Sequence, residues 1–141
     1  DHGISTCIDT SGMFPLTDKI KKVIDVTDIF LLDIKCINDD ICTWLTGHSN
    51  KLELEFARYI SNCSKRLWIR QVLVPGITDK ESDLVLLRDF LKTINVEKFE
   101  FLGYHDLGKY KWEKLGLKYE LENTPIATKD DLDRAYSIIN S

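Results

Sequence analysis

Four short runs of apolar residues recur along the chain, and each is followed by a stretch in which apolar positions have helical spacing. The runs cover residues 4–9, 28–35, 67–74 and 98–104, and their length and composition predict four β-strands. Apolar residues three or four positions apart predict longer helices at 16–26, 50–63, 78–93 and 128–140. Two shorter helices are predicted at 39–45 and 109–114.

Residue types that cap helices mark several of the predicted helix ends. The first short helix is predicted to be capped by Asn38 or Asp39 and to end at Gly47, and the helix at 78–93 to be capped by Thr78 or Asp79. Ser49 or Asn50 would cap the helix at 50–63, whose predicted inward face consists of Leu52, Phe56, Tyr59, Ile60 and Cys63.

The alternation of strands and helices predicts an α/β fold. Over 141 residues it indicates a single domain, residues 1–141, with a parallel sheet of about four βα units. Four units are too few to close an eight-stranded barrel, so we expect an open sheet or an arc of a partial barrel. In both arrangements a parallel sheet binds ligands at the carboxyl ends of its strands.

Every predicted strand delivers polar or ionisable side chains to this end of the sheet. Asp33 and Lys35 lie two positions apart near the end of the second strand, so they share a face with Leu31. Two ionisable groups there cost stability unless they pair or bind a ligand. The sequence therefore predicts a ligand site of mixed charge at this rim. The rim consists of Asp9, Thr10, Asp33, Lys35, Arg70, Tyr104, His105 and Asp106.

Each charged rim residue has both a ligand-binding and a purely structural interpretation. Lys35 and Arg70 could hold a carboxylate or phosphate, and Asp33 could balance Lys35, hold an ammonium group or help bind a cation. His105 could hydrogen-bond a ribose or act as an acid or base. The structural alternatives are a local ion pair for Asp33 with Lys35, a buried salt bridge for Arg70, and a cap for His105.

Composition narrows the class of protein. The chain is 43% hydrophobic and 30% charged, and its net charge of -4 argues against general binding to nucleic acid. No apolar run is long enough to span a membrane and no signal peptide opens the sequence, so we expect a cytoplasmic protein with reduced cysteines. The chain opens on Asp1, and its only methionine is Met13, which suggests a piece of a longer protein.

Residues 104–114 combine basic and aromatic side chains where the strand–helix rhythm is interrupted. This mixture favours a loop that binds a protein partner, and the acidity of the whole chain makes nucleic acid the weaker interpretation. The sequence contains no glycine-rich phosphate loop, serine-nucleophile elbow or His-Glu-x-x-His motif.

Several segments taken together resemble a known family. They are Cys7-Ile8-Asp9-Thr10-Ser11-Gly12, Leu32-Asp33-Ile34-Lys35, Trp68-Ile69-Arg70, Val74-Pro75-Gly76 and Tyr104-His105-Asp106-Leu107-Gly108-Lys109, followed by Lys111-Trp112. Their order and spacing are similar to those of the pyruvate formate-lyase-activating enzymes, which are radical S-adenosylmethionine (SAM) enzymes. That family has a partial barrel of six βα units, and the chain resembles its C-terminal part, the last four.

The resemblance implies an oxidoreductase. In the family a reduced [4Fe-4S] cluster cleaves SAM, and the resulting radical takes a hydrogen atom from a glycine of pyruvate formate-lyase or a related glycyl radical enzyme. An electron donor such as flavodoxin is implied as a second partner. The Cys-x-x-x-Cys-x-x-Cys motif for the iron-sulfur cluster and the Gly-Gly-Glu motif for the SAM amino group do not occur in this chain. We therefore expect the fragment alone to be inactive, with no catalytic residue of its own.

The resemblance also implies roles for individual residues. The run Asp33-Ile34-Lys35 corresponds to the SAM-binding run, with Lys35 at the methionine carboxylate, and His105 corresponds to a histidine on the ribose or adenine side. Arg70 corresponds to a position that supports the site. A monovalent cation beside the SAM carboxylate would be held by Asp9, Thr10, the backbone of Leu31, and Asp33.

The aromatic and basic segment would lie near the point where the glycine loop of the partner enters. Tyr110 stands where the family is expected to have a second histidine, so that position receives no role.

Two other classes of protein remain compatible with the residues. A barrel aldolase could use Lys35 to form a Schiff base, but this needs an amine that loses its proton easily, and Asp33 beside it opposes that loss. A non-catalytic module that binds a protein partner is the other alternative. If the chain is a fragment, its first strand leaves an open sheet edge, which invites pairing between copies.

Overall fold

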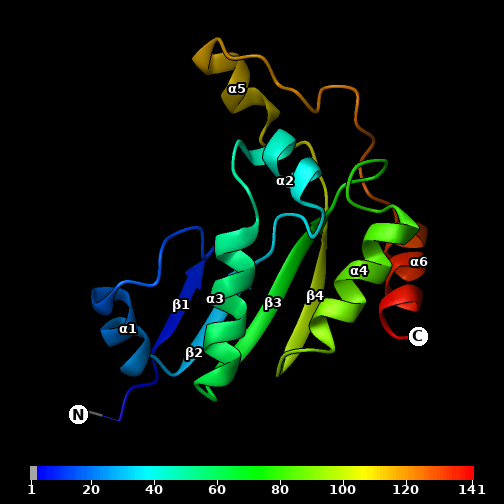
Figure 1. The fold of residues 1–141 in the computed structure, drawn as a ribbon. Coiled ribbons are helices and arrows are strands. Elements are labelled where there is room, and N and C mark those ends of the chain that lie inside the picture. The colour runs from blue at the N-terminus through cyan, green and yellow to red at the C-terminus, as the bar shows by residue number, and fades with distance from the viewer. Residues whose placement is uncertain (1–2) are drawn as a thin grey trace.

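A computed structural model describes residues 3–141, and four parallel strands form its centre (Figure 1). The strands are β1 (Cys7–Thr10), β2 (Ile29–Asp33), β3 (Arg66–Leu73) and β4 (Lys98–Gly103), in the spatial order β1-β2-β3-β4. The helices are α1 (Asp18–Asp25), α2 (Asp39–Thr46), α3 (Lys51–Asn62), α4 (Glu81–Leu91), α5 (Lys109–Leu115) and α6 (Lys129–Ile139). These elements confirm the predicted α/β class and its four βα units. The predicted domain also includes residues 1 and 2, which lie outside the described residues.

The first strand is shorter than predicted because side chains hold the segment before it. Strand β1 begins at Cys7 rather than at residue 4. The backbone N–H of Thr6 donates to the carboxylate of Asp28 at 2.8 Å, so a side chain takes the place of a sheet partner there. Strand β2 likewise ends at Asp33, which leaves Lys35 in the turn that follows.

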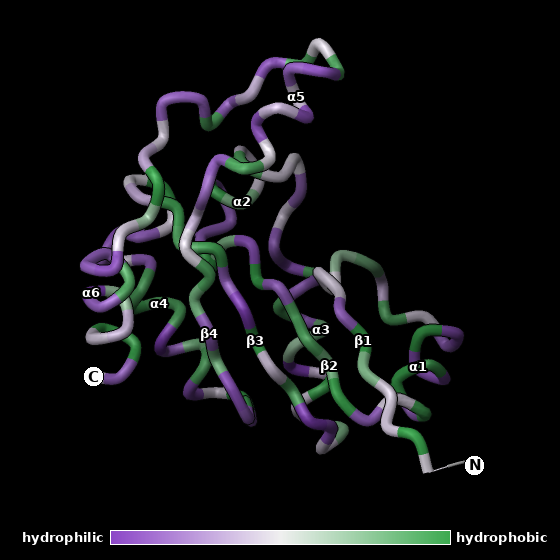
Figure 2. The backbone as a smooth tube through the Cα atoms, turned by 180° about the vertical axis from the view of Figure 1, so that it is seen from behind, coloured by the Kyte–Doolittle hydropathy of each residue, from purple (hydrophilic) through white to green (hydrophobic). Residues whose placement is uncertain are grey.

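In the part of the chain that the structure describes, helices cover only one face of the sheet (Figure 1 and Figure 2). Along β3 the side chains of Leu67, Ile69 and Leu73 are buried toward the helices, whereas Trp68 and Arg70 on the alternate positions are only half-buried. Seen from behind, no helix lies in front of the strands (Figure 2). A parallel sheet normally has both faces covered or closes into a barrel, so an open face is consistent with an arc of a barrel.

The apolar core lies between this sheet and the helices in two parts. One part is formed by β2, β3 and α3, and Phe56 of α3 packs edge-on against Phe30 of β2. The other lies where α4 and α6 meet the ends of β3 and β4. Its buried residues are Leu73, Leu84, Leu87, Phe101 and Ala135. Among the described residues no helix combines the length and apolar character that a membrane span needs.

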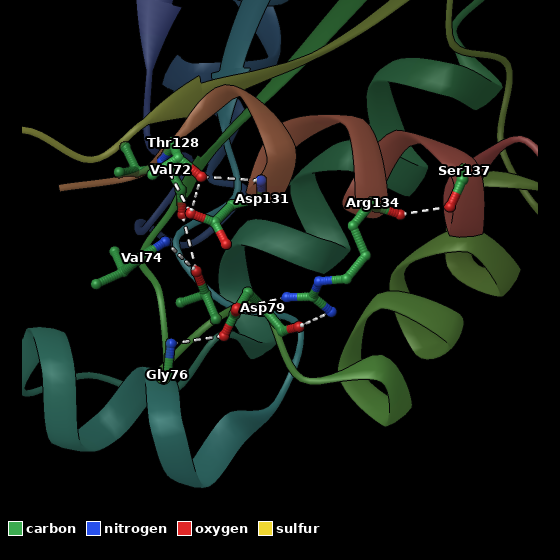
Figure 3. Close-up of polar contacts among 9 residues, drawn as sticks. Val72, Val74, Gly76, Asp79, Thr128, Asp131, Arg134 and Ser137 are labelled. Carbon is green, nitrogen blue, oxygen red and sulfur yellow. Dashed lines mark hydrogen bonds and ion pairs between the residues drawn. The ribbon is translucent and has the colours of Figure 1, made fainter. Parts of the chain in front are cut away.

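The predicted cap of α4 is wrong, because Thr78 and Asp79 stabilise the preceding loop instead. Helix α4 begins at Glu81 after Lys80. The hydroxyl of Thr78 donates to the carbonyl of Val72 and accepts from the N–H of Val74, and Asp79 accepts from Gly76 (Figure 3). Arg134 of α6 donates to the carboxylate of Asp79 at 2.6 Å, which ties α6 to the loop after β3. The predictions that Gly47 ends α2 and that Asn38 caps it are confirmed.

Helix α5 stands apart beyond the carboxyl ends of the strands (Figure 1). It buries none of its residues. The segment after it returns to the body through a hydrogen bond of 2.7 Å between the hydroxyls of Tyr104 and Tyr119. We call residues 105–124, which include α5, the arm.

Candidate functional site

Four charged side chains form a continuous network on the open face of the sheet. Arg70 on β3 donates from Nε to Oδ1 of Asp33 at 2.8 Å and from Nη2 to Oδ1 of Asp9 at 2.7 Å. Lys35 donates from Nζ to the other oxygen of Asp33 at 3.1 Å. The register of the sheet explains the grouping, since Asp33 lies opposite Arg70 and Asp9 lies opposite Leu31 on the neighbouring strand.

The network is balanced in charge and only partly buried. The exposed fraction of the side chain is 22% for Arg70, 27% for Asp33 and 35% for Lys35. Partial burial alone would lower the pKa of Arg70, but the hydrogen bonds to Asp9 and Asp33 outweigh it and raise that pKa. Because Lys35 and Arg70 both reach solvent, the carboxylate of a ligand can bind to either of them. The aspartate that loses its partner in this way can then bind an ammonium group of the ligand.

The structure brings together only some of the predicted site residues. The side chain of Ile34 is fully buried and its N–H donates to the carbonyl of Arg70 at 2.9 Å, so its side chain faces the core. The hydroxyl of Thr10 accepts from the N–H of Gly12 at 3.1 Å. His105 is exposed after β4 and forms no hydrogen bond within residues 3–141. Tyr104 is buried and bonds to the arm instead of lining the rim.

Sequence reasoning missed Glu53, which lies directly behind the turn that carries Lys35. Helix α3 was predicted to turn Leu52 inward, but Leu52 is 38% exposed and Glu53 is fully buried. The carboxyl oxygens of Glu53 accept from the N–H of Lys35 at 3.3 and 3.5 Å. The N–H of Lys35, beyond the end of β2, needs an acceptor, and this explains why Glu53 rather than Leu52 faces the interior. Nothing in the local apolar spacing signals this role.

Two buried thiols, Cys36 and Cys42, lie near this turn. Burial is the main cause that raises the pKa of Cys36 to about 12, and burial also raises the pKa of Cys42. Without a metal ion nearby, burial therefore favours the neutral thiol at both positions. Among residues 3–141 no group of three or more histidine, cysteine, aspartate or glutamate side chains is placed to hold a metal ion.

The fold is that of solved structures from radical SAM enzymes. A domain of a pyruvate-formate lyase-activating enzyme from Bacteroides vulgatus matches 98% of this chain and 76% of its own, with a TM-score of 0.78 and 17% identity. SuiB from Streptococcus suis, solved with S-adenosylmethionine bound, matches 97% of this chain and 29% of its own, with a TM-score of 0.70 and 18% identity. At these identities the likeness shows the fold alone. No protein-family model matches the chain.

Sequence similarity points to a particular group within that fold. The pyruvate formate-lyase-activating enzyme of Streptococcus mutans is 44% identical over 100% of this chain and 56% of its own length. Pyruvate formate-lyase 1-activating enzyme of Escherichia coli is 41% identical over 98% of this chain and 57% of its own length. The chain thus resembles pyruvate formate-lyase-activating enzymes along essentially its whole length, as predicted, and spans a little more than half of theirs.

Proposed function

We propose that the chain is the SAM-binding part of a radical SAM enzyme that activates pyruvate formate-lyase, or a related glycyl radical enzyme, by generating a glycyl radical. The observation that carries the proposal is the identity of 41–44% over 98–100% of the chain to enzymes named for that activity. The chain corresponds to the C-terminal part of such an enzyme, and alone it is inactive.

The charged network suits the amino-acid end of SAM. Lys35 holds the methionine carboxylate, since its ammonium is already placed by Asp33 and its side chain is 35% exposed. Arg70 supports the site by holding the carboxylates of Asp9 and Asp33 in place. The backbone of Ile34, whose N–H donates to the carbonyl of Arg70, forms the adjoining side of the binding site. His105, exposed at the end of β4, contributes from the ribose or adenine side. When bound and reduced, SAM supplies the radical chemistry, and this chain orients the cofactor.

The iron-sulfur cluster does not fit this chain. The four cysteines are Cys7, Cys36, Cys42 and Cys63, and their spacing contains no Cys-x-x-x-Cys-x-x-Cys motif. Cys36 and Cys42 are buried. The cluster ligands therefore belong to the part of the longer protein outside this chain.

Four further predictions accompany this function. A monovalent cation held by Asp9, Thr10, Leu31 and Asp33 stays a prediction, and such a cation would have to share both aspartates with Arg70. We also propose a flavodoxin-type electron donor and a cytoplasmic location. The arm, with its exposed Trp112, is proposed to lie near the glycine loop of the partner.

The aldolase alternative is not favoured. Schiff-base formation needs a lysine amine that is free to attack a carbonyl group, whereas Nζ of Lys35 donates to Asp33 at 3.1 Å. The relatives are activating enzymes, which does not favour a non-catalytic binding module either.

The proposed activity is tested on the full-length gene product purified under anaerobic conditions. We expect bound iron and sulfide, reductive cleavage of SAM, and a glycyl radical signal in electron paramagnetic resonance spectra of pyruvate formate-lyase. Absence of a three-cysteine motif upstream of Asp1 would refute the assignment.

The role of Lys35 is tested by Lys35→Ala in the same protein. Loss of a charged hydrogen bond should weaken SAM binding by about 1.5–3 kcal/mol, or roughly tenfold to a hundredfold in Kd, measured by calorimetry. Lys19→Ala, an exposed lysine on α1, is the matched control and should bind SAM normally. An unchanged Kd for Lys35→Ala would remove Lys35 from the site.

A further inference from the structure

Glu53 is a buried carboxyl group that the proposed chemistry does not use. It lies in the first turn of α3 and none of its surface reaches solvent. Burying a carboxyl group is costly, so a purely apolar side chain would be the simpler choice for this position. The contact that offsets the cost is the N–H of Lys35, which donates to both oxygens of Glu53 at 3.3 and 3.5 Å.

This contact lies at the point where the sheet ladder stops. The N–H of Ile34 still donates to Arg70 on β3, so the N–H of Lys35 is the first beyond the ladder that a side chain must satisfy. Lys35 is therefore fixed twice, by Glu53 at its backbone and by Asp33 at its ammonium.

The neighbours of Glu53 determine its charge. Burial is the largest cause that raises the pKa of Glu53 to about 8, and Asp33 raises it further, while the backbone and the charge of Lys35 lower it. From β2 and its turn the facing groups are Asp33, Lys35 and Cys36, and from α2 the thiol of Cys42 interacts with Glu53. Near neutral pH the carboxyl group is thus mostly protonated, and it fixes the turn without competing for the positive charge of Lys35.

We propose that Glu53 is a positioning residue for Lys35, which it holds in the orientation that receives the carboxylate of SAM. The inference rests on the proposed function of the site. In this proposal Glu53 acts through Lys35 and does not itself contact the ligand.

The first test measures SAM binding by calorimetry in the full-length protein with its cluster reconstituted. Glu53→Gln keeps an acceptor for the N–H of Lys35 and should keep Kd within about twofold of wild type. Glu53→Leu removes the acceptor and should raise Kd about tenfold or more. Glu55→Gln, an exposed glutamate on the same helix, is the matched control and should bind as wild type does. Equal Kd values for Glu53→Leu and wild type would overturn the proposal.

The second test is the pH profile of the same Kd between pH 6.5 and 9, which a merely structural role would not change. Ionisation of Glu53 adds a negative charge behind Lys35, so wild-type affinity should fall relative to Glu53→Gln as pH rises through about 8. The amino group of SAM titrates in the same range, but its effect is common to both proteins. Superimposable profiles would overturn the proposal, and this comparison decides the matter if Glu53→Leu does not fold.

A third measurement separates failure of this inference from failure of the proposed function. In the 141-residue chain, the amide ¹⁵N resonance of Lys35 should shift with a midpoint near pH 8, and Glu53→Gln should abolish the shift. If the shift is seen but wild-type full-length protein binds no SAM, the proposed function fails while the Glu53–Lys35 contact stands. If SAM binds but the shift is missing, the inference fails alone.

Discussion

Arg70 is the residue on which the candidate site depends most. Its two nitrogens bond to aspartates on β1 and β2, so one guanidinium group connects side chains from three adjacent strands. Without it, Asp9 and Asp33 would face each other with only Lys35 to balance them. The planar fork of arginine makes both contacts at once, which a lysine cannot do with the same geometry.

Replacing Arg70 should therefore cost measurable stability. Arg70→Met keeps the apolar stem and removes both charged hydrogen bonds, and we expect a loss of about 1–3 kcal/mol in the free energy of unfolding. Urea denaturation at pH 7 measures this. Arg66→Met is the matched control, because Arg66 pairs with Glu97 at a more exposed place and should cost much less. Equal losses for the two variants would show that the network on the open face adds nothing particular.

Glu53 should make stability depend on pH in an unusual direction. Its pKa in the folded chain is about 8, well above the ordinary value near 4.5, so between these values the folded state holds a proton that the unfolded state has released. Stability should then fall as pH rises from about 5 to 8 and level off above, by at most about 1.4 kcal/mol per pH unit for one proton. The measurement is the difference in unfolding free energy between wild type and Glu53→Gln. A difference that does not vary with pH would contradict the buried, protonated carboxyl.

Alternation along the strands was enough to predict that Asp33 and Lys35 share a face and that Arg70 points toward the same rim. It could not predict Glu53, because the demand for an acceptor arises only when α3 packs behind the end of β2. It also placed Tyr104 at the rim, whereas a tertiary partner, Tyr119, draws that hydroxyl into the arm. Local spacing cannot anticipate such partners.

At the scale of elements, the arm differs from the other βα connections. Helix α5 buries no residue, and several of its apolar side chains, Tyr110, Trp112 and Leu115 among them, are largely exposed. An isolated helix of this length is marginal in water, so contacts made by the rest of the arm must hold it. Those contacts include the ring of Trp112 against that of Tyr119, the ion pair of Lys109 with Glu122 at 3.2 Å, and the hydroxyl pair that joins Tyr119 to Tyr104.

Removing one hydroxyl should loosen the whole arm. In Tyr119→Phe we expect amide hydrogen exchange across residues 109–115 to become several-fold faster, since a lost hydrogen bond is worth about 1 kcal/mol, while exchange in α3 stays unchanged. Tyr136→Phe serves as the control, because its hydroxyl accepts from Phe101 and stabilises β4 against α6 rather than the arm. Exchange in α5 that matches wild type would mean that the tyrosine pair does not hold the arm.

For the whole molecule, the strand–helix alternation predicted the class and the parallel sheet because sequential βα units pack next to one another. It left open whether the sheet is flat or an arc. The uncovered face is consistent with an arc of a barrel, because Trp68 and Arg70 on the face of β3 away from the core are only half-buried. The sequence also could not fix the loop after β3, where Thr78 and Asp79 bond across to β3 and α6 instead of capping α4.

Within residues 3–141 the same arrangement leaves β1 at one end of the sheet, with one edge that pairs with no other strand. Thr6 accepts from Ile29 on the β2 side, and alternate residues of a parallel strand point to opposite sides, so the N–H groups of Cys7 and Asp9 face the free edge. Exposed edges of this kind recruit further strands.

We therefore expect the 141-residue chain to self-associate through β1 in a concentration-dependent manner, measured by sedimentation velocity. Cys7→Pro removes an N–H that faces the edge without removing a bond to β2, and it should shift the chain toward monomer. Cys7→Ala is the control: it deletes the exposed thiol but keeps the N–H, so it should associate as wild type does. If Cys7→Ala is also monomeric under oxidising conditions, a disulfide rather than strand pairing joins the copies. If all three proteins are monomeric at every concentration, the exposed edge is not a site of association.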